Sequence, residues 1–218
     1  MAAALAGCGG SSSNGIASKS ADEIIAASKQ AIAGAKSVHV SGSGLTKGEP
    51  LSIDLELVAG KGAKGTITEH GLSFQLIEVN ETIYINGSPE FYEHFGGPAA
   101  AELFKGKWLK APANSSEFAT FSSLTNLQTL LGSQLEHHGK LTVTGTSTVN
   151  GQEVVGLHDA SRGGTLYIAT TGKPYPVEIT NSGSEGGTIK FDRWNEPVTL
   201  TPPSNAIDIN QLQHAQAG

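Results

Sequence analysis

Alternation of apolar and polar residues recurs along most of this chain, and it limits the fold more than any other feature. In residues 51–57, four apolar side chains alternate with Ser52, Asp54 and Glu56. A period of two places all the apolar side chains on one face of a β-strand. Similar runs recur about every 10 residues with short turns between them, which favours an antiparallel meander. We expect strands at residues 38–43, 51–57, 63–70, 72–80, 82–85, 141–149, 152–157, 165–170, 176–180 and 188–191.

Glycine-containing turns separate these expected strands. Asn150-Gly151 lies between two alternating runs, and this dipeptide is typical of a tight hairpin turn. Residues 60–66 look like a phosphate-binding loop, but they lack its Gly-Lys-Ser/Thr ending and they join two strands. We therefore interpret residues 60–66 as a hairpin turn exposed to solvent.

Three segments have a helical rather than a strand pattern. Ser20 and Glu23 form a capping box before apolar residues at helical spacing, which predicts a helix over residues 21–35. Residues 89–106 predict two short helices, separated at Gly96-Gly97 and with Pro98 at the first position of the second. Residues 122–135 predict a further helix with leucines along one side.

These elements predict an α+β fold of one domain. We expect a strongly curved antiparallel β-sheet of about ten strands, an incomplete barrel, with the helices packed in its concave face. Aromatic residues make up only 6% of the chain, so large side chains are few and the cup has room for a ligand. The net charge of −6 argues against a nucleic-acid partner, because a phosphate backbone favours a basic surface.

Residues of catalytic or metal-binding type are scattered rather than clustered. The seven histidines include no HExxH pair, and no cysteine or carboxylate cluster joins them. His158, Asp159 and Ser161 have the residue types of a catalytic triad, but sequence neighbours seldom face one another suitably in a turn. The chain also has no GxSxG motif. We therefore expect no enzyme activity, no metal site and no cofactor.

The single cysteine, Cys8, points to a membrane anchor. It ends the string Leu5-Ala6-Gly7-Cys8, which resembles a bacterial lipobox. At such a site a peptidase cuts before the cysteine, and the thiol then carries a diacylglycerol. Residues 9–15 are rich in glycine and serine, as a flexible tether is. We interpret residues 1–19 as a truncated signal and lipobox followed by this tether, with Cys8 as the lipidation site.

The order of several motifs resembles a known family. The capped helix is followed by residues 36–42 (KSVHVSG), 106–108 (GKW), 149–157 (VNGQEVVGL), 164–169 (GTLYIA), 175–177 (YPV) and 191–203 (FDRWNEPVTLTPP). In this order they resemble the actinobacterial LppX/LprG lipoproteins, which are similar in fold to the LolA/LolB lipoprotein carriers. The resemblance covers residues 20–212, which we interpret as a single LolA-like domain followed by a disordered tail at 213–218.

The resemblance implies an incomplete barrel with helices in its mouth around an apolar cavity. Such a protein binds acyl chains of lipids or glycolipids and carries them between the membrane and the outer envelope. It implies a lipid or lipoglycan ligand, an envelope transporter as a further partner, and anchoring through acylated Cys8 at the outer face of the cytoplasmic membrane. From the expected facing of each element, we predict that Leu51, Ile53, Leu55, Leu57, Phe74, Leu76, Phe91, Phe95, Leu103, Phe104, Leu124, Leu127 and Leu131 line the cavity.

Two other classes of function remain open at this stage. An envelope scaffold or interaction lipoprotein would have a filled core and no lipid ligand, so a solid interior would favour it. A hydrolase acting on envelope material would need a serine, a histidine and a carboxylate that the fold brings together.

Overall fold

The computed structural model describes residues 12–46, 48–115, 124–136, 138–183 and 186–209. Cys8 and the expected tail at residues 213–218 therefore lie outside the described residues, as do the first two residues of the helix expected at 122–135. Among the residues that are described, no helix is both long and apolar enough to cross a membrane.

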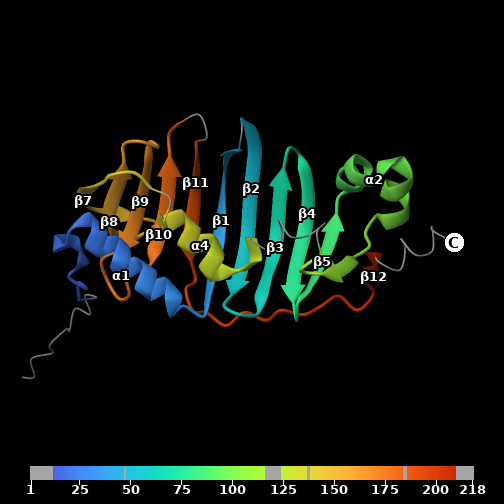
Figure 1. Ribbon diagram of the computed structural model, residues 1–218, viewed down its shortest axis with the longest axis horizontal. Helices are drawn as coiled ribbons and strands as arrows, with labels where there is room; N and C mark the ends of the chain where they lie inside the picture. Colours follow the sequence, from blue (N-terminus) through green and yellow to red (C-terminus); the bar gives the residue numbers. More distant parts are fainter. Residues whose placement is uncertain (1–11, 47, 116–123, 137, 184–185, 210–218) are drawn as a thin grey trace, which may run out of the picture.

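A single sheet of twelve strands forms the body of the described chain (Figure 1). Its strand order is β12-β6-β5-β4-β3-β2-β1-β11-β10-β9-β8-β7, and neither edge strand pairs with the other, so the curved sheet stays unclosed. The strands are β1 (Ser37–Thr46), β2 (Glu49–Val58), β3 (Gly62–Glu69), β4 (Leu72–Val79), β5 (Thr82–Gly87), β6 (Leu109–Pro112), β7 (Leu141–Val149), β8 (Gln152–Asp159), β9 (Gly164–Ala169), β10 (Pro176–Asn181), β11 (Gly187–Asp192) and β12 (Ile207–Asp208).

The predicted α+β class and curved antiparallel sheet are confirmed. All ten expected strands are present, and Asn150-Gly151 joins β7 to β8 as expected. The turn predicted at residues 60–66 is shorter than expected, because β3 begins at Gly62 and pairs with β2 from there. The sequence also allows a short strand at residues 107–109, and β6 begins at the last of these residues. The twelfth strand, β12, pairs with β6 in parallel through Ile207 and Leu109. The short β12 has no alternating pattern of its own, and only its position beside β6 makes it a strand.

Helices lie against one face of this sheet. They are the 3-10 turn η1 (Ile16–Ser18), α1 (Ala21–Ala33), α2 (Pro89–Phe104) and α4 (Leu127–Glu136). The capping box of α1 is present: the Ser20 hydroxyl accepts from the Glu23 N–H at 3.4 Å, and the Glu23 carboxylate accepts from the Ser20 N–H at 2.9 Å. Figure 1 shows α1 and α4 across the strands from β7 to β3, and α2 at the end near β4 and β5.

Of the two other expected helical segments, one agrees with the prediction and one differs from it. Residue Gly97 breaks α2 with φ of 78°, so the predicted separation of two short helices is confirmed. The helix expected at residues 122–135 is interrupted: residues 124–125 are helical, Asn126 is not, and α4 begins at Leu127. Its start is set by Asn126, whose side-chain oxygen accepts from the Thr129 N–H at 2.9 Å, as an N-cap does.

The folded domain begins before Ser20, where the sequence led us to expect its N-terminal boundary. Ile16 is only 2% exposed and belongs to the main core. The Asn14 amide donates to the carbonyl oxygens of Ala169 and Gly172 at 3.0 and 3.1 Å. Residues 13–18 therefore belong to the folded domain. They look like a tether in sequence because one isoleucine among small polar residues makes no periodic pattern.

A C-terminal strap, which we define as residues 193–206, runs from β11 past the lower strand ends to β12 (Figure 1). Trp194 stacks on Tyr175 with ring centroids 4.3 Å apart, and its indole N–H donates to the Pro176 carbonyl at 3.1 Å. Asn195 accepts from the Lys36 N–H at 2.8 Å. Trp194 is therefore a packing residue.

Candidate functional site

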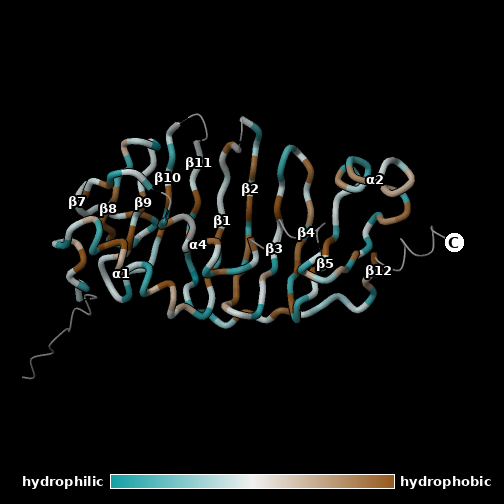
Figure 2. The backbone as a smooth tube through the Cα atoms, viewed as in Figure 1, coloured by the Kyte–Doolittle hydropathy of each residue, from teal (hydrophilic) through white to brown (hydrophobic). Residues whose placement is uncertain are grey.

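The strand register aligns apolar side chains in rows across the face that carries the helices. Residues directly opposite one another in paired strands share a face of the sheet. One such row runs through all strands from β8 to β4, and Gly42 is its one residue without a side chain. Figure 2 shows the resulting alternation of hydrophobic and hydrophilic residues along the strands. The row consists of Leu157, Leu166, Ile179, Ile189, Gly42, Ile53, Ile67 and Phe74.

Most of the predicted lining residues belong to one packed core. Leu55, Leu57 and Leu76 have 0% exposure, so no space as large as a water molecule touches them. Phe74, Leu127 and Leu131 are also buried in this core, and Leu51, Ile53, Phe91 and Leu124 pack against it while partly exposed. Phe104 is partly buried beside Tyr92, whereas Phe95 and Leu103 are 69% and 51% exposed on α2. The helices thus fill the concave face in this conformation.

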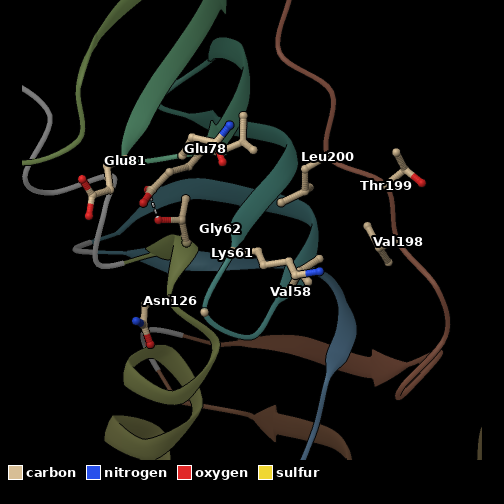
Figure 3. Close-up of a pocket in the computed structure, with 13 residues that line it drawn as sticks. Val58, Lys61, Gly62, Glu78, Glu81, Asn126, Val198, Thr199 and Leu200 are labelled. Atoms are coloured by element: carbon tan, nitrogen blue, oxygen red, sulfur yellow. Dashed lines mark hydrogen bonds between the residues drawn. The ribbon is translucent and has the colours of Figure 1, made fainter.

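A large hollow lies at the rim of the sheet, beside the turns that follow β2 and β4 (Figure 3). We call it the rim hollow. It has a volume of about 690 Å³ and lies between strand ends, the start of α4 and the C-terminal strap. None of the predicted lining residues borders it. Its lining consists of Val58, Gly60, Lys61, Gly62, Glu78, Val79, Asn80, Glu81, Thr125, Asn126, Val198, Thr199 and Leu200.

One carboxylate joins the rim hollow to the covering helix. Glu78 lies opposite Ala63 and Ile83 in the register, so it shares the core-facing side of the sheet with them. The Thr125 hydroxyl, just before α4, donates a hydrogen bond to the Glu78 carboxylate, drawn as a dashed line in Figure 3. We call this contact the latch, because it fastens the start of α4 to β4. Sequence reasoning missed Glu78, although its spacing of two from Leu76 was a signal.

The residues of triad type have structural partners. The Asp159 carboxylate accepts from the Gly139 N–H at 2.7 Å, the Ser161 N–H at 2.9 Å and the Ser161 hydroxyl at 2.5 Å. These hydrogen bonds, led by that of the Ser161 side chain, lower the pKa of Asp159 to about 2. His158 instead contacts the Thr165 hydroxyl at 3.2 Å. Asp159 and Ser161 therefore fasten the connection between α4 and β7.

A charged network covers the opposite face of the sheet. His39 lies between Asp192 and Asp54, with its ring nitrogens 2.7 and 3.1 Å from their carboxylate oxygens. Beside it, Glu56 pairs with both Arg193 and Lys64, at 3.0 and 3.1 Å. Within the described part of the chain, no three or more His, Cys, Asp or Glu side chains form a group that could hold a metal.

Solved structures of known proteins resemble this protein, whereas neither family models nor curated sequences do. No family model and no curated protein matches this sequence. Among solved structures, LprF from Mycobacterium bovis superposes with a TM-score of 0.60 at 18% identity, over 89% of this chain and 99% of LprF. The lipoprotein LppX from Mycobacterium tuberculosis superposes with a TM-score of 0.54 at 20% identity, over 84% of this chain and 100% of LppX.

This chain has the fold of LprF and LppX. The resemblance to LppX/LprG proteins that the motif order indicated is thereby confirmed at the level of the fold. LprF and LppX are matched along almost their whole lengths, so the likeness is not confined to a common fragment.

Proposed function

We propose that this protein is an envelope lipoprotein of the LppX/LprG type that binds acyl chains of a lipid or glycolipid and carries them between membrane and outer envelope. The observation that carries the proposal is the apolar row across an unclosed sheet, covered by short helices. An acyl chain gains about 0.8 kcal/mol for each CH₂ that leaves water, so a carrier needs a long apolar surface.

Binding requires the covering helices to move, because the core beneath them is filled. The helix α4 is the better candidate for this movement. It has ten residues, and at its start the latch between Thr125 and Glu78 is a polar contact at the edge of the rim hollow. Displacing α4 would remove its leucines from the core that also contains Leu55, Leu57 and Leu76, and would exchange leucine contacts for acyl-chain contacts of similar energy.

The rim hollow suits the polar end of such a lipid. Lys61, Asn126 and Glu81 offer both donors and acceptors around it, and Glu78 joins it to the core-facing side of the sheet (Figure 3). Its volume of about 690 Å³ is within the usual range of about 300–1,000 Å³ for small-molecule sites. The proposed lipid therefore has its headgroup at the rim and its chains beneath α4.

The proposal places the protein at the outer face of the cytoplasmic membrane. Acylation of Cys8 supplies the anchor, and residues before Ser13 supply the tether. The protein is proposed to have no catalytic role. An envelope transporter that loads or unloads the lipid is its proposed partner.

The alternative is an interaction lipoprotein without a lipid ligand, and one observation favours it. Three of the predicted lining leucines are fully buried in a packed core, as in a domain that encloses nothing. The two functions differ in whether the core ever opens to an acyl chain.

Extraction of the purified protein with organic solvent and mass spectrometry of the extract decides between them. The full chain carries Cys8→Ser, so that no anchor lipid contributes, and is produced in an actinobacterial host. We expect a diacyl or triacyl lipid in stoichiometric amount. A blank extract, both directly and after incubation with host lipids, would overturn the proposal in favour of the interaction lipoprotein.

A variant of the latch tests the route of entry. Thr125→Val keeps the shape of the side chain but removes the hydroxyl that donates to Glu78, so α4 should detach more readily. We expect a fluorescent long-chain acyl probe to bind several-fold faster than to the unmodified protein. Thr129→Val, on the exposed side of α4, is the matched control and should leave the rate unchanged. Equal rates for the two variants would contradict entry beneath α4.

A further inference from the structure

A second, smaller cavity lies at the other end of the molecule from the rim hollow. We call it the α1 slot, because it lies between α1, the end of α4 and strands β7 to β10. Its volume is about 170 Å³, below the range of about 300–1,000 Å³ for whole small-molecule ligands. It has space for one narrow chain. Its lining consists of Ile25, Leu135, His138, Leu141, Leu157, Asp159, Arg162, Gly164, Thr165, Leu166, Ile179 and Asn181.

The floor of the α1 slot is apolar. Leu157, Leu166 and Ile179 are direct partners across β8, β9 and β10, so they form one continuous surface. Ile25 of α1 and Leu135 of α4 approach this surface from the helix side. The floor therefore favours an alkyl chain.

The polar residues of the α1 slot include a guanidinium without a charged partner. Arg162 makes no ion pair with any described residue, whereas the other arginine of the chain, Arg193, pairs with Glu56 at 3.0 Å and with Asp192 at 3.5 Å. The carboxylate of Asp159 also lines the α1 slot, but it makes no ion pair with Arg162, and its oxygens accept from Gly139 and Ser161. A planar guanidinium is well suited to a carboxylate or a phosphate, which it can bind through two parallel hydrogen bonds.

A histidine adds a second polar group beside Arg162. The His138 Nδ1 lies 2.8 Å from the carbonyl oxygen of Gly139. A carbonyl oxygen can only accept, so Nδ1 carries a proton and Nε2 is left to contact a ligand. The α1 slot thus combines an apolar floor with an unpaired cation, which is the pattern expected for a molecule with one alkyl chain and one anionic group.

We propose that the α1 slot binds a single-chain anionic amphiphile, with its alkyl chain on Leu157, Leu166 and Ile179 and its carboxylate or phosphate at Arg162. Leu157, Leu166 and Ile179 are also one end of the apolar row of the proposed function, but the α1 slot is a separate cavity at that end, and the inference does not require the multi-chain lipid to bind. The slot can be occupied while α4 covers the sheet, because the cavity is already present in the closed conformation.

Calorimetric titration of the full chain with decanoate, decyl phosphate and decanol tests the chemistry. The variant is Arg162→Gln, and Lys173→Gln, an exposed lysine in the β9–β10 turn, is the matched control for loss of one charge. We expect Arg162→Gln to weaken the binding of decanoate and of decyl phosphate at least tenfold and to leave the binding of decanol unchanged. Lys173→Gln should change none of the three. The ratio between decanoate and decyl phosphate then shows which anion the site prefers.

The position of the site is tested separately. Leu166→Phe fills the slot with a larger side chain, so all three probes should lose their binding. If this variant does not fold, hydrogen exchange of the unmodified protein with and without decanoate replaces it, and protection should appear at residues 157–166 and 138–141. Absence of saturable decanoate binding, equal affinity for the Arg162→Gln variant, or protection only at the rim hollow would each overturn the proposal.

The two proposals can fail separately. A multi-chain lipid in the solvent extract without decanoate binding would leave the proposed function standing and refute the α1 slot. Decanoate binding that depends on Arg162, together with a blank extract, would support the α1 slot and refute the proposed function.

Discussion

Gly65 lies in the middle of β3, where a strand would normally have a β-branched residue. A Cβ atom built there would overlap the carbonyl oxygen of Asp54 in the neighbouring strand. Gly42 is in the same position in β1, against the carbonyl oxygen of Thr188. These two glycines let adjacent backbones approach closely, and such approaches accompany the bending of a sheet.

The first prediction concerns this close approach. Gly65→Ala should lower the free energy of unfolding by at least about 2 kcal/mol, because the overlap is with backbone that cannot rotate away. Urea denaturation measures the change. Gly34→Ala, at the end of α1 with negative φ and only ordinary contacts around its Cβ, is the control and should stay within about 0.5 kcal/mol. A small effect at both glycines would show that β3 adjusts freely.

The second prediction concerns Ser28, in the middle of the buried face of α1. Its hydroxyl is fully buried and has no hydrogen-bond partner. Burying an unsatisfied hydroxyl costs about 1–3 kcal/mol, and alanine is also the better helix former. Ser28→Ala should therefore raise the free energy of unfolding by about 1 kcal/mol or more in the same urea measurement.

The control for Ser28 separates burial from helix propensity. Ala26→Ser makes the reverse change on the exposed face of α1, where only propensity acts, and should lower stability by about 0.5 kcal/mol. If the two changes in the free energy of unfolding are opposite in sign but equal in size, only helix propensity acts at both positions. The hydroxyl of Ser28 would then have a hydrogen-bond partner in solution.

At the scale of elements, the connection from α4 to β7 is fastened by a side chain of another strand. Asp159, at the end of β8, accepts from the backbone of Gly139 and so places the start of β7. The hydrogen bonds that hold this carboxylate require its charged form. The pKa of Asp159 is lowered to about 2 from its ordinary value near 3.8.

The third prediction follows from that pKa. A lowered pKa in the folded state means that the stabilisation is complete above about pH 5 and is lost as the pH falls through 3.8 toward 2. Asp159→Asn should melt at a lower temperature than the unmodified protein at pH 7. The difference should shrink below pH 4 and vanish near pH 2. Thermal denaturation over this range checks it, with Glu49→Gln, an exposed carboxylate, showing no such dependence.

At the scale of the whole molecule, the C-terminal strap links the middle of the sheet to its far edge. Its first part is fixed by Trp194, Asn195 and Glu196, which contact Tyr175, Pro176 and the start of β1. Its last part is fixed by Ile207, whose N–H donates to the Trp108 carbonyl at 2.8 Å. The strap thus borders the rim hollow between two fixed ends.

The fourth prediction tests the fixed end at Trp194. Trp194→Leu removes the stacking on Tyr175 and the hydrogen bond to Pro176, so stability should fall by about 2–4 kcal/mol. Hydrogen exchange of Ile207 should also become faster, because the strap then holds β12 less firmly. Trp108→Leu is the control, because it keeps the backbone carbonyl that binds Ile207. It should lower the free energy of unfolding by less than Trp194→Leu does. Equal losses for the two tryptophans would contradict a special role for Trp194.

The residues of the sequence determine the local elements of this protein. Ser20 and Glu23 start α1, alternation such as that of residues 51–57 makes the strands, and Asn150-Gly151 closes a hairpin. Each of these signals depends on residues a few positions apart, and their contacts form in almost any tertiary context. The curvature, the helix-covered face and the burial of most predicted lining leucines follow from these patterns.

Only the tertiary structure decided the remaining features. Asn14 binds residues more than 150 positions away, β12 is a strand because β6 lies beside it, and the carboxylate of Glu78 is bound by the distant Thr125. The rim hollow and the α1 slot are both lined by segments that are distant in the chain. No local pattern records such contacts, because their energies depend on which distant groups the folded chain brings together.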